Sequence, residues 1–102
     1  MSTRDQYVAT LKNQIDQWNA EIANWEGRAK EAKRAVKTGL RLQVKSVNAQ
    51  RELARYNLKL LEAASTAAWD DMRSGADEAF NRMQAAMKDA RSHFEASPPP
   101  AA

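Results

Sequence analysis

Apolar residues recur in a regular rhythm over the first third of this chain. From Val8 to Val36 they alternate steps of three and four positions, which amounts to four uninterrupted heptads. This spacing is typical of a coiled-coil seam, the line along which one helix packs against another. The predicted seam consists of Val8, Leu11, Ile15, Trp18, Ile22, Trp25 and Val36, with Ala29 and Ala32 at the remaining positions. The chain is therefore expected to begin as a long helix whose apolar stripe needs a partner.

Composition extends the helical prediction over most of the 102 residues. There are only 3 Gly and 3 Pro, and the prolines stand together at positions 98–100, while strong helix formers dominate residues 5–95. A mean hydropathy of −0.74 and 28% charged residues leave little material for a thick globular core. We therefore expect an all-α fold, either an elongated coiled coil or a long antiparallel helical hairpin. Residues 1–95 would form one domain, and residues 96–102 a short disordered, Pro-rich tail.

A second apolar pattern repeats every eleven residues. AWDDM at 68–72 returns as AFNRM at 79–83. Eleven residues in three turns correspond to about 3.67 residues per turn, so this stripe stays on one face of a nearly straight helix. Such a face can meet a partner helix or lie on a lipid surface. The stripe consists of Leu58, Leu61, Trp69, Met72, Phe80, Met83 and Phe94.

The two patterns leave the position of the turns open. Beyond Val36 the steps of the seam change, and Gly39 lies at this change, so a kink, a helix end or an unbroken helix all fit. A turn near residues 64–66 is favoured because Ser65 and Thr66 are good N-caps. That turn would also set an acidic helix against a basic one. A turn near Ser46 to Asn48 is the alternative. With the first turn, the N-terminal heptads project unpaired, which predicts self-association into a homodimer or small bundle.

Charge is distributed in three blocks. Residues 1–27 hold two basic against four acidic side chains, residues 28–59 hold ten against two, and residues 60–102 hold four against seven. The blocks can neutralise one another, or the middle one can bind an external polyanion. Within it, cations that step by four beside an apolar stripe are typical of a basic amphipathic helix at an anionic membrane or granule surface. A solvated helix flank has the same pattern. The candidate contacts are Lys33, Lys37, Arg41 and Lys45.

Catalytic chemistry finds little support in the sequence. The chain has no cysteine and no Gly-rich phosphate loop, and its single histidine, His93, stands four residues after Asp89 as two exposed groups near a helix end. Asp70 and Asp71 are adjacent, so on a helix they diverge and favour a helix start instead of a carboxylate pair. We expect no enzyme activity, no cofactor, no metal and no small-molecule substrate.

Nucleic acid is a less favoured partner than a lipid surface or a second copy of the chain. The aromatic residues Trp18, Trp25, Trp69 and Phe80 lie on the apolar stripes, which favours core packing over base stacking. No stretch approaches the roughly 20 apolar residues of a membrane span. MSTRDQYVAT carries no apolar run typical of a secretory signal, so the expected location is cytoplasmic.

Two segments resemble a known family. DQYVATLKNQIDQWNAEI at 5–22 and AASTAAWDDMRSGADEAFNRMQAAM at 63–87 are similar to small bacterial coiled-coil proteins described as stress-response proteins, whose molecular function is not established. The middle segment departs from the family's Glu-rich pattern because it is strongly basic. The resemblance implies a cytoplasmic, non-enzymatic structural or interaction protein with a link to stress. The alternative is a peripheral amphipathic protein that binds an anionic membrane, a granule surface or another polyanion through its basic middle.

Overall fold

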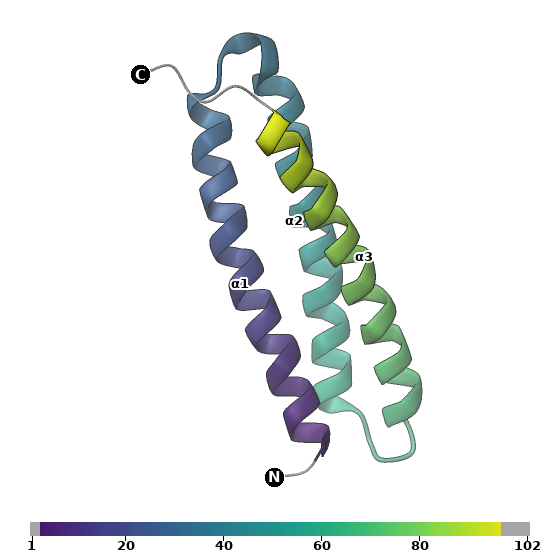
Figure 1. Cartoon of the computed structure of the whole chain (residues 1–102). Coiled ribbons are helices and arrows are strands. Elements are labelled where there is room, and N and C mark those ends of the chain that lie inside the picture. Colours follow the sequence, from purple (N-terminus) through teal and green to yellow (C-terminus); the bar gives the residue numbers. More distant parts are fainter. Residues whose placement is uncertain (1–2, 97–102) are drawn as a thin grey trace.

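The computed structural model describes residues 3–96 and places them in three helices (Figure 1). These are α1, Thr3–Glu31, α2, Arg34–Ala63, and α3, Trp69–Ala96. Each helix runs antiparallel to the preceding one, so α1 and α3 point the same way (Figure 1). The described residues contain no strand, which confirms the all-helical prediction. Of the predicted tail, Ala96 is the last residue of α3, and residues 97–102 lie outside the described part.

The molecule is elongated along the helix axes. Its extents are 54 × 21 × 17 Å, and its radius of gyration is 16.2 Å. A compact domain of 100 residues has a radius of gyration of about 13 Å. Long helices laid side by side explain the difference, because a helix of 30 residues already spans about 45 Å.

The chain reverses first at Ala32 and Lys33, where the heptad pattern predicts a continuous helix. The predicted seam is therefore wrong in its continuity, since Val36 lies on α2 and the residues from Val8 to Trp25 lie on α1. Lys33 is the N-cap residue of α2 in an extended conformation, with φ −62° and ψ 148°. The reversal allows the apolar face of α1 to be covered by the same chain.

Charges around this reversal disfavour a continuous helix. Lys30 and Arg34 would stand four positions apart on such a helix, as would Lys33 and Lys37, and like charges at that spacing repel. In the observed structure Arg28 and Lys30 occupy the last turn of α1, where the helix dipole favours cations. The break thus separates Lys30 from Arg34 and gives α1 a favourable end, although Lys33 and Lys37 remain one turn apart at the start of α2.

Gly39 is an ordinary interior residue of α2. The helix continues through it from Arg34 to Ala63, so the chain reverses before the position at which the sequence allowed a kink. A side chain built at Gly39 would meet no atom within 4 Å. The glycine therefore neither ends the helix nor permits a close approach.

The second turn occupies residues 64–68, between Ala63 and Trp69. The hydroxyl oxygen of Ser65 accepts a hydrogen bond of 3.2 Å from the backbone N–H of Ala68. Helix α2 is unbroken at Ser46, the alternative turn position. As a consequence the eleven-residue stripe is divided: Leu58 and Leu61 lie on α2, and the members from Trp69 onward lie on α3.

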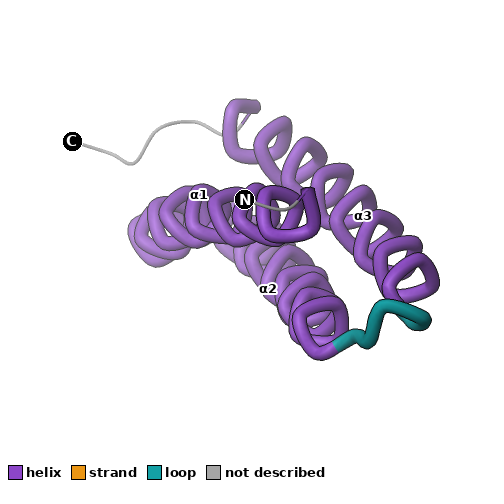
Figure 2. The backbone as a smooth tube through the Cα atoms, turned by 90° about the horizontal axis from the view of Figure 1, so that it is seen from below, coloured by secondary structure: helices purple, strands orange, loops and turns teal. Residues whose placement is uncertain are grey.

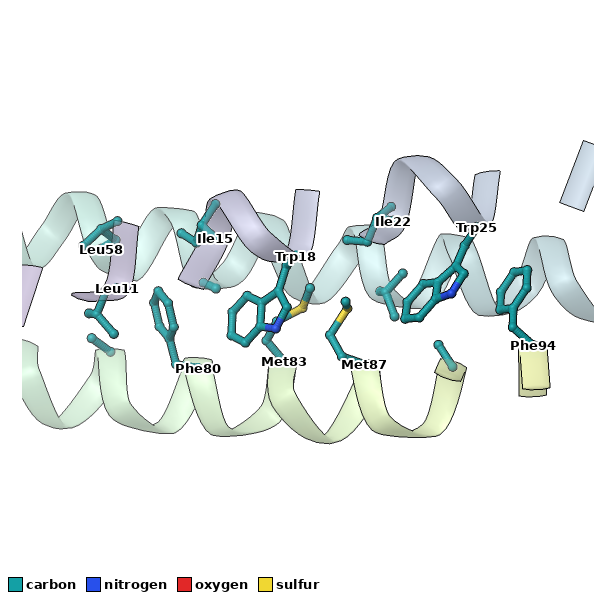
Figure 3. Packing of buried hydrophobic residues seen from close by; sticks show 14 of the residues in the cluster. Leu11, Ile15, Trp18, Ile22, Trp25, Leu58, Phe80, Met83, Met87 and Phe94 are labelled. Atoms are coloured by element: carbon teal, nitrogen blue, oxygen red, sulfur yellow. The ribbon is translucent and has the colours of Figure 1, made fainter. Parts of the chain in front are cut away.

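The core runs along the line where the three helices face one another (Figure 3). It draws Trp18 and Ile22 from α1, Val47 and Leu61 from α2, and Met83, among others, from α3. The apolar face of α1 is therefore occupied within the chain. The expectation that the N-terminal heptads project unpaired is wrong.

Aromatic pairs join α1 to α3 across the core. Trp25 stacks on Phe94, with ring centroids 5.3 Å apart and planes within 9° of parallel, and Trp18 lies 5.5 Å from Phe80. Figure 3 shows these rings between the two helices. Helices α1 and α3 run in the same direction and are not consecutive in the chain. The large rings at these positions fill the space between them.

Polar contacts hold both ends of α1 against the rest of the chain. Near its start, the Arg4 guanidinium donates to the backbone oxygen of Ala64, just after α2, and lies 4.5 Å from the centroid of the Trp69 ring. Near its end, Arg28 donates to the backbone oxygen of Phe94 at 3.0 Å. That bond satisfies a carbonyl in the last turn of α3, which has no partner within the helix.

Candidate interaction surface on helix α2

Helix α2 is the basic helix of the three. Its 30 residues contain seven cations and two carboxylates, whereas α3 contains four cations and six carboxylates. Helix α1 is close to balance, with four cations and five carboxylates. Most of the excess positive charge of the chain is thus concentrated on one element.

One side of α2 is not covered by the other helices. Viewed along the bundle in Figure 2, α1 and α3 both lie above α2, and its lower side faces away from them. Exposed side chains on that side form what we call the α2 outer face. It consists of the cations Arg34, Arg41, Lys45 and Lys59 and the apolar residues Leu42, Leu53 and Tyr56.

The cations of the α2 outer face form a line along the helix. A helix turns by about 100° per residue, so Arg34, Arg41, Lys45 and Lys59 fall within about 40° of one another. From the first to the last of them the line is about 38 Å long at 1.5 Å per residue. One carboxylate, Glu52, falls on the same line, where it lies 3.7 Å from Arg55 and 3.8 Å from Arg51.

An apolar stripe runs beside the line of cations. Leu42 and Tyr56 are each 60% exposed and Leu53 is 48% exposed, and these are the exposed large hydrophobic residues of the described chain. Leu42 and Leu53 lie about 80 to 100° around the helix from Arg34, and Tyr56 falls between the stripe and the cations. Leu53 also borders a crevice shared with Gly75 and Ala79, so the apolar stripe is on the α3 side of the face.

The cations of the α2 outer face have no carboxylate partner among residues 3–96. Ion pairs of α2 cations in that range remain within the helix, where Arg51 and Arg55 approach Glu52. The turn near residues 64–66 is favoured in the sequence partly because it sets an acidic helix against a basic one, so carboxylates of α3 are expected to neutralise cations of α2. In the described residues no ion pair joins an α2 cation to an α3 carboxylate, because α3 packs on α2 through its apolar face.

Two ion pairs join α1 to the neighbouring helices. Glu21 accepts two hydrogen bonds from Arg91 of α3, at 2.8 and 2.9 Å, and Glu62 of α2 lies 3.1 Å from the Lys12 ammonium. The hydrogen bonds from Arg91 to Glu21 raise the pKa of Arg91 above its ordinary value, although partial burial acts in the opposite direction. These pairs bind α1 to the bundle and leave the α2 outer face untouched.

The four cations predicted from the sequence do not all belong to this face. Arg41 and Lys45 lie on it and are exposed. Lys33 lies in the turn between α1 and α2, and Lys37 is half-buried on the second turn of α2. The four predicted cations thus do not share one side of the helix, because a step of four residues exceeds one helical turn and their line drifts around α2.

Sequence reasoning missed Leu42, Leu53 and Tyr56 as surface residues. Part of the signal was present, because on a helical projection Leu42 and Leu53 fall about 80 to 140° around the helix from the buried Val47 and Leu61. The same projection would have placed Lys59 with Arg41. Without the position of the first turn, however, the sequence could not show which apolar side of this segment is buried and which is exposed.

Other candidate sites offer less. His93 Nδ1 lies 2.9 Å from the backbone oxygen of Asp89 and 3.8 Å from its carboxylate, and Asp70 and Asp71 occupy the exposed first turn of α3. Over residues 3–96 there is no group of three or more potential metal ligands. Trp18, Trp25 and Phe80 are at most 7% exposed, so these rings present no free face to a nucleic-acid base.

Among the described residues, no helix combines the length and apolarity needed to pass through a lipid bilayer. Comparison with models of protein families, with curated proteins and with solved structures found no match.

Proposed function

We propose that this protein is a non-enzymatic interaction module that binds an anionic partner surface through the α2 outer face. The observation that carries the proposal is the coincidence of four exposed cations without carboxylate partners and three exposed large hydrophobic residues on the same uncovered helix side. Isolated exposed apolar residues are common, but here the three occur on one side of one helix beside a line of cations, and this combination supports a binding surface.

Burial elsewhere in the bundle supports this choice. The seam of α1 and the stripe of α3 have their partners inside the chain, so neither is available to bind another molecule without unfolding. The α2 outer face needs no such change. Its uncompensated charge attracts anions from a distance, while its apolar residues gain from being removed from water after contact.

The broader expectations from the sequence belong to the same proposal. They are a coiled-coil type of helix packing, a cytoplasmic bacterial protein related to stress, and the resemblance to the small coiled-coil proteins. Self-association also remains a proposal, but the structure removes its original reason, because Trp18 and Trp25 are already buried by Phe80 and Phe94. A homodimer would have to use a surface other than the α1 seam.

Binding to a soluble polyanion tests the proposal. Fluorescence anisotropy with labelled heparin fragments should show binding that weakens as salt is raised. Because each cation near an anionic surface contributes about 1 kcal/mol, Arg41→Glu/Lys45→Glu should weaken binding at least tenfold.

The matched control is Lys30→Glu/Lys88→Glu. It makes the same change in net charge with exposed residues of α1 and α3. If binding depends on the α2 outer face, this control should keep most of the affinity. Equal losses in the two variants, or no binding by the wild-type protein, would contradict the proposal.

A further inference from the structure

We infer that the anionic partner of the α2 outer face is the surface of a lipid bilayer that contains anionic lipids. This inference rests on the proposed function, because it names the partner of the same face. It commits α2 to lie parallel to the bilayer plane, with α1 and α3 on the side of the water.

The arrangement of the α2 outer face matches the two layers of a bilayer surface. Headgroup phosphates lie outermost and acyl chains beneath them, and an interfacial helix meets both by placing cations beside an apolar stripe. Here Arg41 and Lys45 can meet phosphates while Leu42 and Leu53 enter the boundary of the acyl chains. Tyr56, between the two stripes and 60% exposed, is the amphipathic type of side chain that is enriched at this level of a membrane.

The face is also long and convex enough for such contact. Leu42 and Leu53 stand about 16 Å apart along the helix, so two apolar anchors enter the surface at separate points. A single uncovered helix presents no groove that would grip a polymer. A flat bilayer, in contrast, can contact the whole 38 Å line of cations at about the same depth.

Nucleic acid fits the α2 outer face less well. The phosphates of a nucleic acid could pair with the cations, but a phosphate backbone offers no apolar surface against which Leu42 and Leu53 could be buried. The indoles best suited to stack on bases, Trp18 and Trp25, are buried in the core. The exposed apolar residues therefore favour a partner with an apolar layer beneath its charges.

A second copy of this chain also fits less well. Symmetric pairing of two α2 outer faces would bring Arg41 and Lys45 against cations of the other copy, which is unfavourable. Pairing with the acidic α3 of another copy joins two different surfaces. Such contacts close into a dimer only if a two-fold axis also sets the second α2 on the first α3; otherwise they form a ring or an open filament.

Membrane binding predicts a weak, charge-dependent attachment. Three large apolar residues are few for an interfacial helix, so binding should require anionic lipid and should weaken with salt. Each cation contributes about a fivefold factor in affinity near an anionic bilayer. We therefore expect binding to vesicles of phosphatidylcholine with phosphatidylglycerol and little binding to vesicles of phosphatidylcholine alone.

Vesicle flotation of the full chain, together with heparin binding, tests the inference. Leu42→Gln/Leu53→Gln keeps every charge and alters only exposed residues, so circular dichroism should show an unchanged helical bundle. This variant should lose at least fivefold in binding to phosphatidylglycerol vesicles and keep its binding to heparin. Arg41→Glu/Lys45→Glu should lose both.

The alternative outcomes separate the two proposals. Wild-type protein that binds heparin but no vesicles would overturn the lipid inference and leave the proposed function standing. Binding to neither would overturn both. Vesicle binding by Leu42→Gln/Leu53→Gln equal to the wild type would also overturn the inference. So would a dimer, detected by light scattering, that this variant dissociates, because a second copy would then cover the face.

Discussion

Trp25 shows at the residue scale why the aromatic positions of α1 are structural. Its side chain is 4% exposed and lies parallel to the Phe94 ring, and Arg28 approaches the same phenylalanine ring to 5.2 Å from its centroid. Removal of the indole would leave a cavity between α1 and α3 that neither helix can close alone. The residue therefore determines the separation of the two helices.

We expect Trp25→Ala to lower the free energy of unfolding by about 3–5 kcal/mol, because a large buried side chain is lost and a cavity remains. Urea unfolding followed by circular dichroism measures the change. Tyr56→Ala serves as the control: this side chain is 60% exposed, and its loss should change stability by no more than about 0.5 kcal/mol. Similar effects of the two substitutions would show that Trp25 is not in the core.

Individual side chains also show how much of the core could be predicted from the sequence. The periodic patterns correctly indicated which side of each helix is apolar, since Leu11, Ile15 and Ile22 are all buried, while Val8 and Val36 pack against the core at half-burial. They could not show that Leu42 is exposed. Hydrophobicity alone does not distinguish a core residue from a surface anchor when the neighbouring helices are unknown.

At the scale of the element, the start of α2 lacks the usual stabilising features of a helix N-terminus. Lys33 is its N-cap, and the side chain makes no capping hydrogen bond. The first turn contains no acidic residue to complement the helix dipole. A better cap should therefore stabilise the reversal between α1 and α2.

We predict that Lys33→Ser is more stable than Lys33→Ala by about 1 kcal/mol. Both substitutions remove the same charge, but the serine hydroxyl can accept a hydrogen bond from a free N–H in the first turn. The midpoints of thermal or urea unfolding compare the two variants directly. Equal stability would mean that α2 does not begin at Arg34, as a helix continuous from α1 would require.

The reversal itself was beyond the reach of the heptad pattern. Apolar positions continue in phase from Trp25 to Val36 across Ala32 and Lys33, because the end of one helix and the start of the next both contribute to the same core. No glycine or proline marks the break. The repeated like-charge spacings of Lys30, Lys33 and Lys37 were the available signal, but each such pair changes helix stability by only about 0.5 kcal/mol or less.

At the scale of the molecule, folding has buried both apolar patterns of the sequence and left one side of α2 with charged and apolar residues exposed. The fold class and the elongated shape followed from composition and periodicity. The arrangement of α1 did not, because the sequence pattern fits a partner helix in the same chain as well as one in another chain. The α2 outer face emerges only when all three helices are placed.

The most direct test of the account is to map where an anionic partner contacts the protein. Amide chemical shifts of the isotopically labelled chain, recorded while short heparin fragments are added, would provide this map. We predict shifts concentrated on the α2 outer face, around Arg41, Lys45 and Tyr56, with little change near Lys12 or Lys88. Shifts centred on α1 or α3, or spread evenly over all cations, would contradict the central claim.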